Sequence, residues 1–113
     1  MRKATLCLYK NEKLLKKYEN INIISKDNRH SLIIDDTKTI ISKDNIIREN
    51  NEYRFELDIT NKKATYLLKD KNAMFDIDVE RISYNNEKNI TIIDYKISSD
   101  NENTKIELIM NGE

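Results

Sequence analysis

The chain has 113 residues, in which 20 Lys and Arg balance 20 Asp and Glu, and it holds one His, one Cys, one Gly, no Pro and no Trp. A single Gly excludes the glycine-rich loops that cradle phosphates, while one His and one Cys exclude a zinc cluster and a disulfide framework. Zero net charge argues against a dedicated nucleic-acid-binding protein, because such proteins usually carry a basic excess.

The N-terminal segment, MRKATLCLYK, has two basic residues ahead of apolar ones, as a signal peptide does. Its apolar part is too short for a targeting segment, and Lys10 ends it. Nothing in the sequence approaches the ~20 apolar residues that a membrane-spanning helix needs, so no membrane contact is expected. We predict a first strand over 3–9, a cytoplasmic location and a reduced, half-buried Cys7.

The next segment, 11–18 (NEKLLKKY), is the best candidate for a helix, because it begins with the capping residue Asn11 and holds two adjacent leucines. So short a segment is marginal for a helix, so we predict a strand over 13–24 and keep a helix as the alternative. The segment also holds most of the one basic cluster of the chain, which we interpret as a solvated strand and turn rather than a nucleic-acid patch. That cluster consists of Lys10, Lys13, Lys16 and Lys17, close to Tyr18.

Strict alternation of apolar and polar residues is typical of the second half of the chain. In YRFELDIT (53–60) every second side chain is apolar, and the segments around 75–80 and 105–110 repeat the pattern. A strand sends successive side chains to opposite faces, so each of these segments has one apolar and one solvated face. As helices the same segments would scatter their charges all round, and we therefore predict strands.

Asn and Asp lie between the alternating segments, where Gly is usually found. Hairpin turns need positive φ at one or two positions, and Asn and Asp tolerate it best after Gly. The turn positions predict ten short antiparallel strands with tight connections. The predicted strands cover 3–9, 13–24, 29–35, 37–43, 45–49, 53–60, 63–70, 73–84, 89–98 and 103–110.

No long linker, repeat or shift in composition divides the chain, so we expect one domain over residues 1–113. An antiparallel meander with one buried face has to protect its edges, and closure into a barrel protects them most completely. The predicted fold class is therefore all-β, a small antiparallel up-and-down β-barrel of about eight to ten strands. A two-sheet sandwich is the alternative.

The run from residue 37 to residue 110 resembles the YwiB-like family, small bacterial proteins with a calycin-like (lipocalin-like) β-barrel and no established activity. TKTIISKDNIIREN ends in Arg48-Glu49-Asn50, at the place of that family's Arg-x-Gly motif. YRFELDIT, KATYLLKD, AMFDIDVERISY, NITIIDYKIS and TKIELIM follow in the order of its later strands, and residues 4–35 fit more loosely. The resemblance implies a calycin-like barrel and singles out Arg48 as the one recurrent charged position.

The chain departs from the family pattern at two glycines. Asn50 stands at the glycine of the Arg-x-Gly motif, and Lys71-Asn72 replaces a Tyr-Gly corner before the long strand. Asn keeps the left-handed backbone option, so we expect these changes to leave the fold intact. The chain is also shorter around 35–37, which would narrow or open one rim of the barrel.

Few residues suggest catalysis. His30 is the only imidazole, and we interpret it as a polar residue at the rim of the barrel, because no carboxylate near it in sequence can orient it. Asp76, Asp78 and Glu80 share one strand face at about 7 Å spacing, and could hold Ca²⁺ or Mg²⁺ if a second strand added oxygens. A solvated outer face with basic partners across the strands is the favoured interpretation. We expect no catalytic residue, no metal and no cofactor.

Arg48 is the charged residue of most interest. An inward Arg in a barrel needs polar or acidic partners to offset its desolvation, so it either anchors an anionic ligand or ties down one end of the barrel. Tyrosines, with an apolar body and a polar tip, suit a cavity wall or a core position with a wet end. The candidate ligand-binding residues are Arg48, Tyr53, Tyr66, Tyr84 and Tyr95. A small barrel has an interior that side chains fill or that holds one small ligand, and both alternatives stand at this point.

These observations predict a non-enzymatic cytoplasmic β-barrel that binds a small apolar or amphipathic ligand in its interior. The alternative is a protein-interaction module that uses a strand edge or the segment from Lys10 to Tyr18. A nucleic-acid-binding five-stranded barrel ranks below both, and an enzyme comes last. The expected partner is a small molecule rather than a nucleic acid or a membrane, and the protein is expected to be a monomer or a homodimer.

Overall fold

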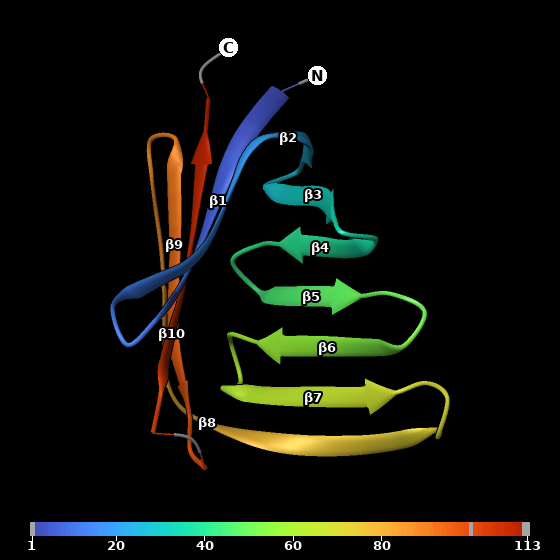
Figure 1. Ribbon diagram of the computed structural model, residues 1–113. Helices are drawn as coiled ribbons and strands as arrows, with labels where there is room; N and C mark the ends of the chain where they lie inside the picture. Colours follow the sequence, from blue (N-terminus) through green and yellow to red (C-terminus); the bar gives the residue numbers. More distant parts are fainter. Residues whose placement is uncertain (1, 100, 112–113) are drawn as a thin grey trace.

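The computed structural model describes residues 2–99 and 101–111 and consists of ten antiparallel strands closed into a barrel. The strands follow chain order around the barrel, and β1 closes the ring by pairing with β10 (Figure 1). They are β1 (Arg2–Lys10), β2 (Lys13–Lys26), β3 (Arg29–Ile34), β4 (Thr37–Ile41), β5 (Asn45–Glu49), β6 (Tyr53–Asp58), β7 (Lys63–Leu68), β8 (Ala73–Glu87), β9 (Ile90–Ile97) and β10 (Asn103–Met110).

The prediction of an all-β, antiparallel up-and-down barrel is confirmed, and each predicted strand is found with its ends shifted by no more than three residues. The helix considered for 11–18 does not form, because these residues make the β1–β2 turn and the first part of β2. The described part of the chain has no helix that is long and apolar enough to cross a membrane.

Three two-residue turns, which join β1 to β2, β2 to β3 and β3 to β4, confirm that Asn and Asp take the place of Gly. Both residues of each turn have positive φ, from 49° to 69°, as type I′ hairpin turns require. Five of these six residues are Asn or Asp, which tolerate the left-handed region better than other side chains do. The turns are Asn11-Glu12, Asp27-Asn28 and Asp35-Asp36.

The two turns at which the family pattern has glycine use Asn in different ways. Asn72 has a φ of 48°, so it adopts the left-handed conformation. Asn50 instead accepts hydrogen bonds at its Oδ1 from the backbone N–H groups of Glu52 (2.8 Å) and Tyr53 (3.1 Å), and its Nδ2 donates to Thr37 Oγ1 at 3.1 Å. Asn50 therefore shapes its turn through its side chain, as an Asx turn does.

The two longest strands, β2 and β8, form the corners of the barrel. β2 pairs with β1 between residues 13 and 23 but with β3 only through 23–26, and β8 pairs first with β7 and then with β9. Each corner strand has a register shift, near Asn20 in β2 and at Glu80 in β8, and such bulges bend a strand. As a result β3 to β7 run across the view in Figure 1, while β1, β9 and β10 run along it.

The core of the barrel is one cluster of buried apolar side chains. Leu57, Ile93 and Leu108 are fully buried in one apolar cluster with Ala4 and Ala64. The strand ends at which the chain begins and finishes lie beside this cluster, because its member Ala4 on β1 pairs with Met110 of β10. The side chains nearer the other end of the strands line a cavity instead.

The left-handed backbone in the turn after β8 yields a stability prediction. Lys88 has a φ of 54° there, and a side chain other than Asn, Asp or Gly is disfavoured in this region by about 1 kcal/mol. Lys88→Gly is therefore expected to raise the free energy of unfolding, measured by urea titration, by up to about 1 kcal/mol.

The matched control for this change is Lys71→Gly in the β7–β8 turn, where the lysine does not have positive φ. Gly there only adds freedom to the unfolded chain, so the control should be neutral or destabilising. Stabilisation of the same size in both variants would contradict the assignment of strain to Lys88.

Candidate functional site

A cavity of about 760 Å³ lies at the end of the barrel that holds the β1–β2 turn. Its walls come from β1, β2, β5, β6, β7, β9 and β10, so it lies inside the barrel rather than in a single loop. Leu8, Ile46, Phe55 and Ile106 give it an apolar lining. Small-molecule sites in proteins are typically cavities of about 300–1,000 Å³ with mostly apolar walls and a few polar groups.

The structure brings four of the five predicted ligand-binding residues together around this cavity: Arg48, Tyr53, Tyr66 and Tyr95. Tyr84, on β8, is not among the residues that line the cavity, and burial raises the pKa of its hydroxyl.

The tyrosine wall of the cavity is flat and follows from strand pairing. Arg48, Phe55 and Tyr66 lie directly opposite one another on β5, β6 and β7, so their side chains share one face of the sheet. Tyr53, two residues before Phe55, points to that same face. The Tyr53 and Tyr66 rings stack with their centroids 5.5 Å apart and their planes at 12°. The cavity therefore has a planar aromatic wall beside a guanidinium.

The Arg48 guanidinium has no protein partner. It forms no hydrogen bond or ion pair with any of residues 2–99 and 101–111, and its nitrogen atoms are reached by solvent. The side chain lines both the main cavity and an adjoining cavity of about 130 Å³. Of the two roles expected for Arg48, tying down a barrel end through an acidic partner therefore has no support in the described residues.

The N-terminal hairpin supplies cavity residues that the sequence analysis did not place there. The sequence predicts the segment from Lys10 to Tyr18 as a solvated strand and turn, yet Lys10, Lys16 and Tyr18 all line the cavity. Lys16 Nζ lies 6.0 Å from the centroid of the Tyr18 ring. The alternation of side chains along a strand could have indicated this. Lys10 lies two residues after Leu8, and Lys16 lies two residues before Tyr18, so each lysine faces the same side as its apolar neighbour.

The charged residues that line the cavity are all basic. They are Lys10, Lys16 and Arg48, and no Asp or Glu is among the described residues of the lining. The chain as a whole carries as many acidic as basic residues, so the cavity differs in charge from the rest of the protein. The cavity is thus an apolar, tyrosine-rich space with a positive potential.

The other candidates for chemistry form simple surface contacts. His30 Nδ1 lies 2.7 Å from Ser25 Oγ across the β2–β3 pair, and burial, followed by the charge of Arg2, lowers the pKa of His30. Glu80 on β8 forms an ion pair with Lys96 at 3.3 Å, as expected for a solvated outer face. Among residues 2–99 and 101–111 no group of three or more His, Cys, Asp or Glu is arranged to hold a metal ion.

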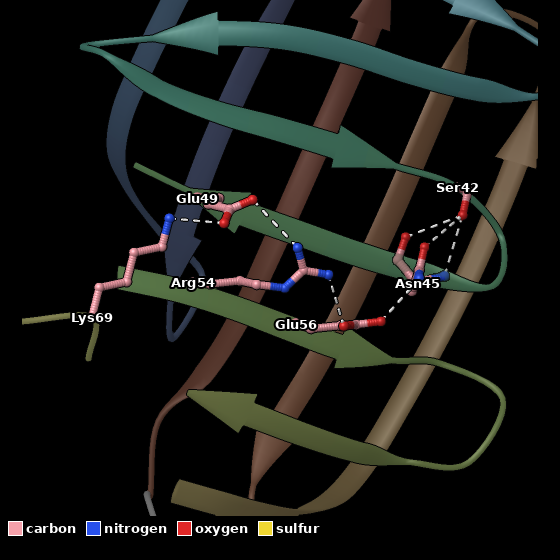
Figure 2. A network of polar contacts seen from close by, with 6 residues as sticks. All are labelled: Ser42, Asn45, Glu49, Arg54, Glu56 and Lys69. Carbon is pink, nitrogen blue, oxygen red and sulfur yellow. Dashed lines mark hydrogen bonds and ion pairs between the residues drawn. The ribbon is translucent and has the colours of Figure 1, made fainter. Parts of the chain in front are cut away.

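A polar network covers the outer face of β5 and β6 (Figure 2). Glu49 lies between Lys69, whose Nζ is 2.9 Å from Oε2, and Arg54, whose Nη1 is 3.3 Å from Oε1. Arg54 also donates to Glu56 at 3.1 Å, and the side-chain amide of Asn45 donates to Glu56 at 3.2 Å. Each charge in this network has an opposite charge beside it, so the network stabilises the strand pair and needs no ligand.

The network makes stability depend on pH through Glu49. The hydrogen bond from Lys69, with the charges of Lys69 and Arg54, outweighs partial burial and lowers the pKa of Glu49 below its usual 4.5. Ionised Glu49 therefore stabilises the fold above about pH 4.5, and this stabilisation is lost as the pH falls through the lower pKa of the folded state. Glu49→Gln is expected to lower the free energy of unfolding at pH 7 by less than about 1 kcal/mol, because partly exposed ion pairs are weak.

The difference between Glu49→Gln and wild type should shrink towards zero near about pH 3, as followed by urea titration at several pH values. Glu87→Gln, at an exposed position of β8, is the control and should behave as wild type throughout. A gap between Glu49→Gln and wild type that stays constant down to low pH would contradict the ion-pair origin of the effect.

The fold alone does not identify the function, because barrels host many unrelated activities. The chain matches no family model, no curated protein and no solved structure. The cavity, with its size, its apolar walls and its basic lining, is the feature of this protein that points to a function.

Proposed function

We propose that the protein is a non-enzymatic, cytoplasmic β-barrel that binds a small amphipathic molecule in its interior. The observation that carries this proposal is the cavity of about 760 Å³ inside the barrel, beside the buried core. A space of this size suits one drug-sized molecule.

The walls of the cavity supply the affinity. Ile46 and Ile106, which are 1% and 7% exposed, lie where the cavity meets the core, and Leu8 and Phe55 extend the apolar surface outward. A ligand that buries about 200 Å² of apolar surface there would gain about 5 kcal/mol before the cost of association. Basic and tyrosine side chains beside these walls favour a ligand with a polar end.

Two further observations support the proposal. The described residues that line the cavity include no His, Cys, Asp or Glu, the side chains that most often act as general bases or nucleophiles. Cys7 is a buried free thiol, which fits a reducing compartment. We also propose the calycin-like assignment and the bacterial origin that the family resemblance implies, with the closed up-and-down barrel as support.

Binding can be measured with N-phenyl-1-naphthylamine, a neutral probe whose fluorescence rises in apolar surroundings. We expect wild type to bind it at one site with a micromolar dissociation constant. Ile106→Trp adds bulk where the cavity meets the core and should weaken binding at least about tenfold, because the ring occupies the probe's volume.

The control for Ile106→Trp is Met74→Trp, at a position of β8 that is 64% exposed and outside the cavity lining. The chain has no Trp of its own, so each variant carries a single one and the two have comparable intrinsic fluorescence. Circular dichroism verifies that both variants fold. Equal binding by the two variants, or no binding by wild type, would contradict the proposal.

A second candidate function is the capture of an acidic, extended peptide at the open edge of β2. Because β3 pairs with β2 only through residues 23–26, the edge of residues 13–22 has no partner strand in the described part of the chain. An extended peptide can add to such an edge as a further strand. The edge carries three exposed lysines, together with two leucines that are 51% and 59% exposed. Their order is Lys13, Leu14, Leu15, Lys16 and Lys17.

This second function is tested by titrating ¹⁵N-labelled protein with a peptide of alternating Glu and Val at low salt. We expect the amide signals of residues 13–22 to shift and to become protected from hydrogen exchange, because the peptide would pair with their free N–H groups. Lys13→Glu with Lys17→Glu should abolish the shifts, whereas the same reversal at Lys43 and Lys71, in exposed turns, should leave them. Unchanged spectra of wild type would exclude this function.

A further inference from the structure

We infer that the ligand of the cavity is a flat organic anion, whose acid group binds the Arg48 guanidinium and whose apolar body packs against the tyrosine wall. The inference rests on the proposed function and names the chemical class of its ligand.

The charge of the cavity selects an anion. In a chain with 20 acidic and 20 basic side chains, the cavity takes Lys10, Lys16 and Arg48 into its lining and, among the described residues, no carboxylate. Inside a space with low-dielectric walls, charges act on one another more strongly than they do in bulk water. A neutral ligand would leave these three positive charges uncompensated, and a cation would be repelled by them.

Arg48 is the group best placed to bind the acid. Its guanidinium is reached by solvent and has no partner among residues 2–99 and 101–111, so an anion displaces only water from it. Asp35, the one acidic residue that lines the adjoining smaller cavity, forms no ion pair with Arg48. A guanidinium offers two parallel N–H donors that match the two oxygens of a carboxylate or sulfonate. Arg48 is thus a preformed anion site that the protein itself leaves open.

The tyrosines select a flat body. Four tyrosines aside from Tyr9, whose hydroxyl and ring contact Glu107 and Lys105, line the cavity: Tyr18, Tyr53, Tyr66 and Tyr95. The stacked pair of Tyr53 and Tyr66 presents a planar surface, against which aromatic rings pack in offset or edge-to-face arrangements. Tyr66 lies beside Phe55, and Phe55 beside Arg48, so the flat wall adjoins the acid-binding group. The arrangement suits a rigid aromatic acid better than a flexible chain.

Two probes that differ by a single acid group test the inference. 1-Anilinonaphthalene-8-sulfonate is N-phenyl-1-naphthylamine with one sulfonate added, so the ratio of their dissociation constants isolates the contribution of the charge. We expect wild type to bind the sulfonate about 10- to 100-fold more tightly than the neutral probe, as hydrogen bonds to charged groups allow.

Arg48→Met keeps an unbranched apolar stem and removes the charge. It should abolish the preference for the sulfonate and leave the affinity for the neutral probe unchanged or higher. Arg29→Met, an exposed position of β3 outside the cavity, makes the same change in net charge and should keep the preference. Competition experiments distinguish a flat ligand from a flexible one. We expect 2-naphthoate to displace the sulfonate probe at least about tenfold better than dodecanoate, which carries the same charge on a flexible chain.

The outcomes separate this inference from the proposed function. Equal affinities of wild type for the two probes would overturn the anion site, and so would an undiminished preference of Arg48→Met for the sulfonate probe. In either case, binding of the neutral probe would still support the proposed function. Failure of both probes to bind would overturn the proposed function itself. Stronger competition by dodecanoate would overturn the flat body of the ligand. The comparison of the two probes on wild type needs no variant, so it tests the preference of the cavity for an anion even if Arg48→Met does not fold.

Discussion

Closure of the backbone ladder between the first and last strands is the constraint on which the rest of this structure depends. A sheet edge presents unpaired N–H and C=O groups, and β1 and β10 satisfy theirs by pairing from Ala4 with Met110 to Lys10 with Thr104. Closure fixes the ring at ten strands, and the width of a barrel grows with its number of strands. A chain of this length then has to fill a wide interior, and a cavity remains beside its core cluster.

The corner strands β2 and β8 determine at which end of the barrel the cavity lies. In the core cluster, the small side chains Ala4 and Ala64 lie among buried leucines and isoleucines. Towards the end with the β1–β2 turn, residues 13–22 of β2 pair with β1 alone, so this part of the wall is carried by one strand pair. Large residues such as Tyr53 and Tyr66 line this end without closing it. The cavity therefore follows from the geometry of closure together with the placement of small and large side chains.

Local patterns explain how far the sequence predicts this structure. The ten strands and their turns follow from period two and from Asn and Asp at positive φ, both of which are properties of neighbouring residues. Arg48 was singled out by the family resemblance, and in the structure it lines the cavity together with Ile46. Tyr84 shows the limit, since it packs against the core as Tyr95 does, yet only Tyr95 lines the cavity. Its height along the barrel depends on long-range register, and the bulge near Asn20 likewise decides which side chains of β2 face the cavity.

Arg48 and Glu49 show how one strand places two neighbouring charges in different surroundings. The two residues are adjacent, so β5 sends Glu49 to the outer face and Arg48 to the cavity. Glu49 has Lys69 and Arg54 beside it, and nothing more is needed to compensate its charge. Arg48 has only solvent, so part of its desolvation on folding remains unbalanced until an anion arrives. An anion bound there would raise the free energy of unfolding, because it binds the folded chain alone. Once the site is saturated, this increase grows with the logarithm of the anion concentration. The proposed ligand would thus couple the stability of this barrel to the Arg48 guanidinium.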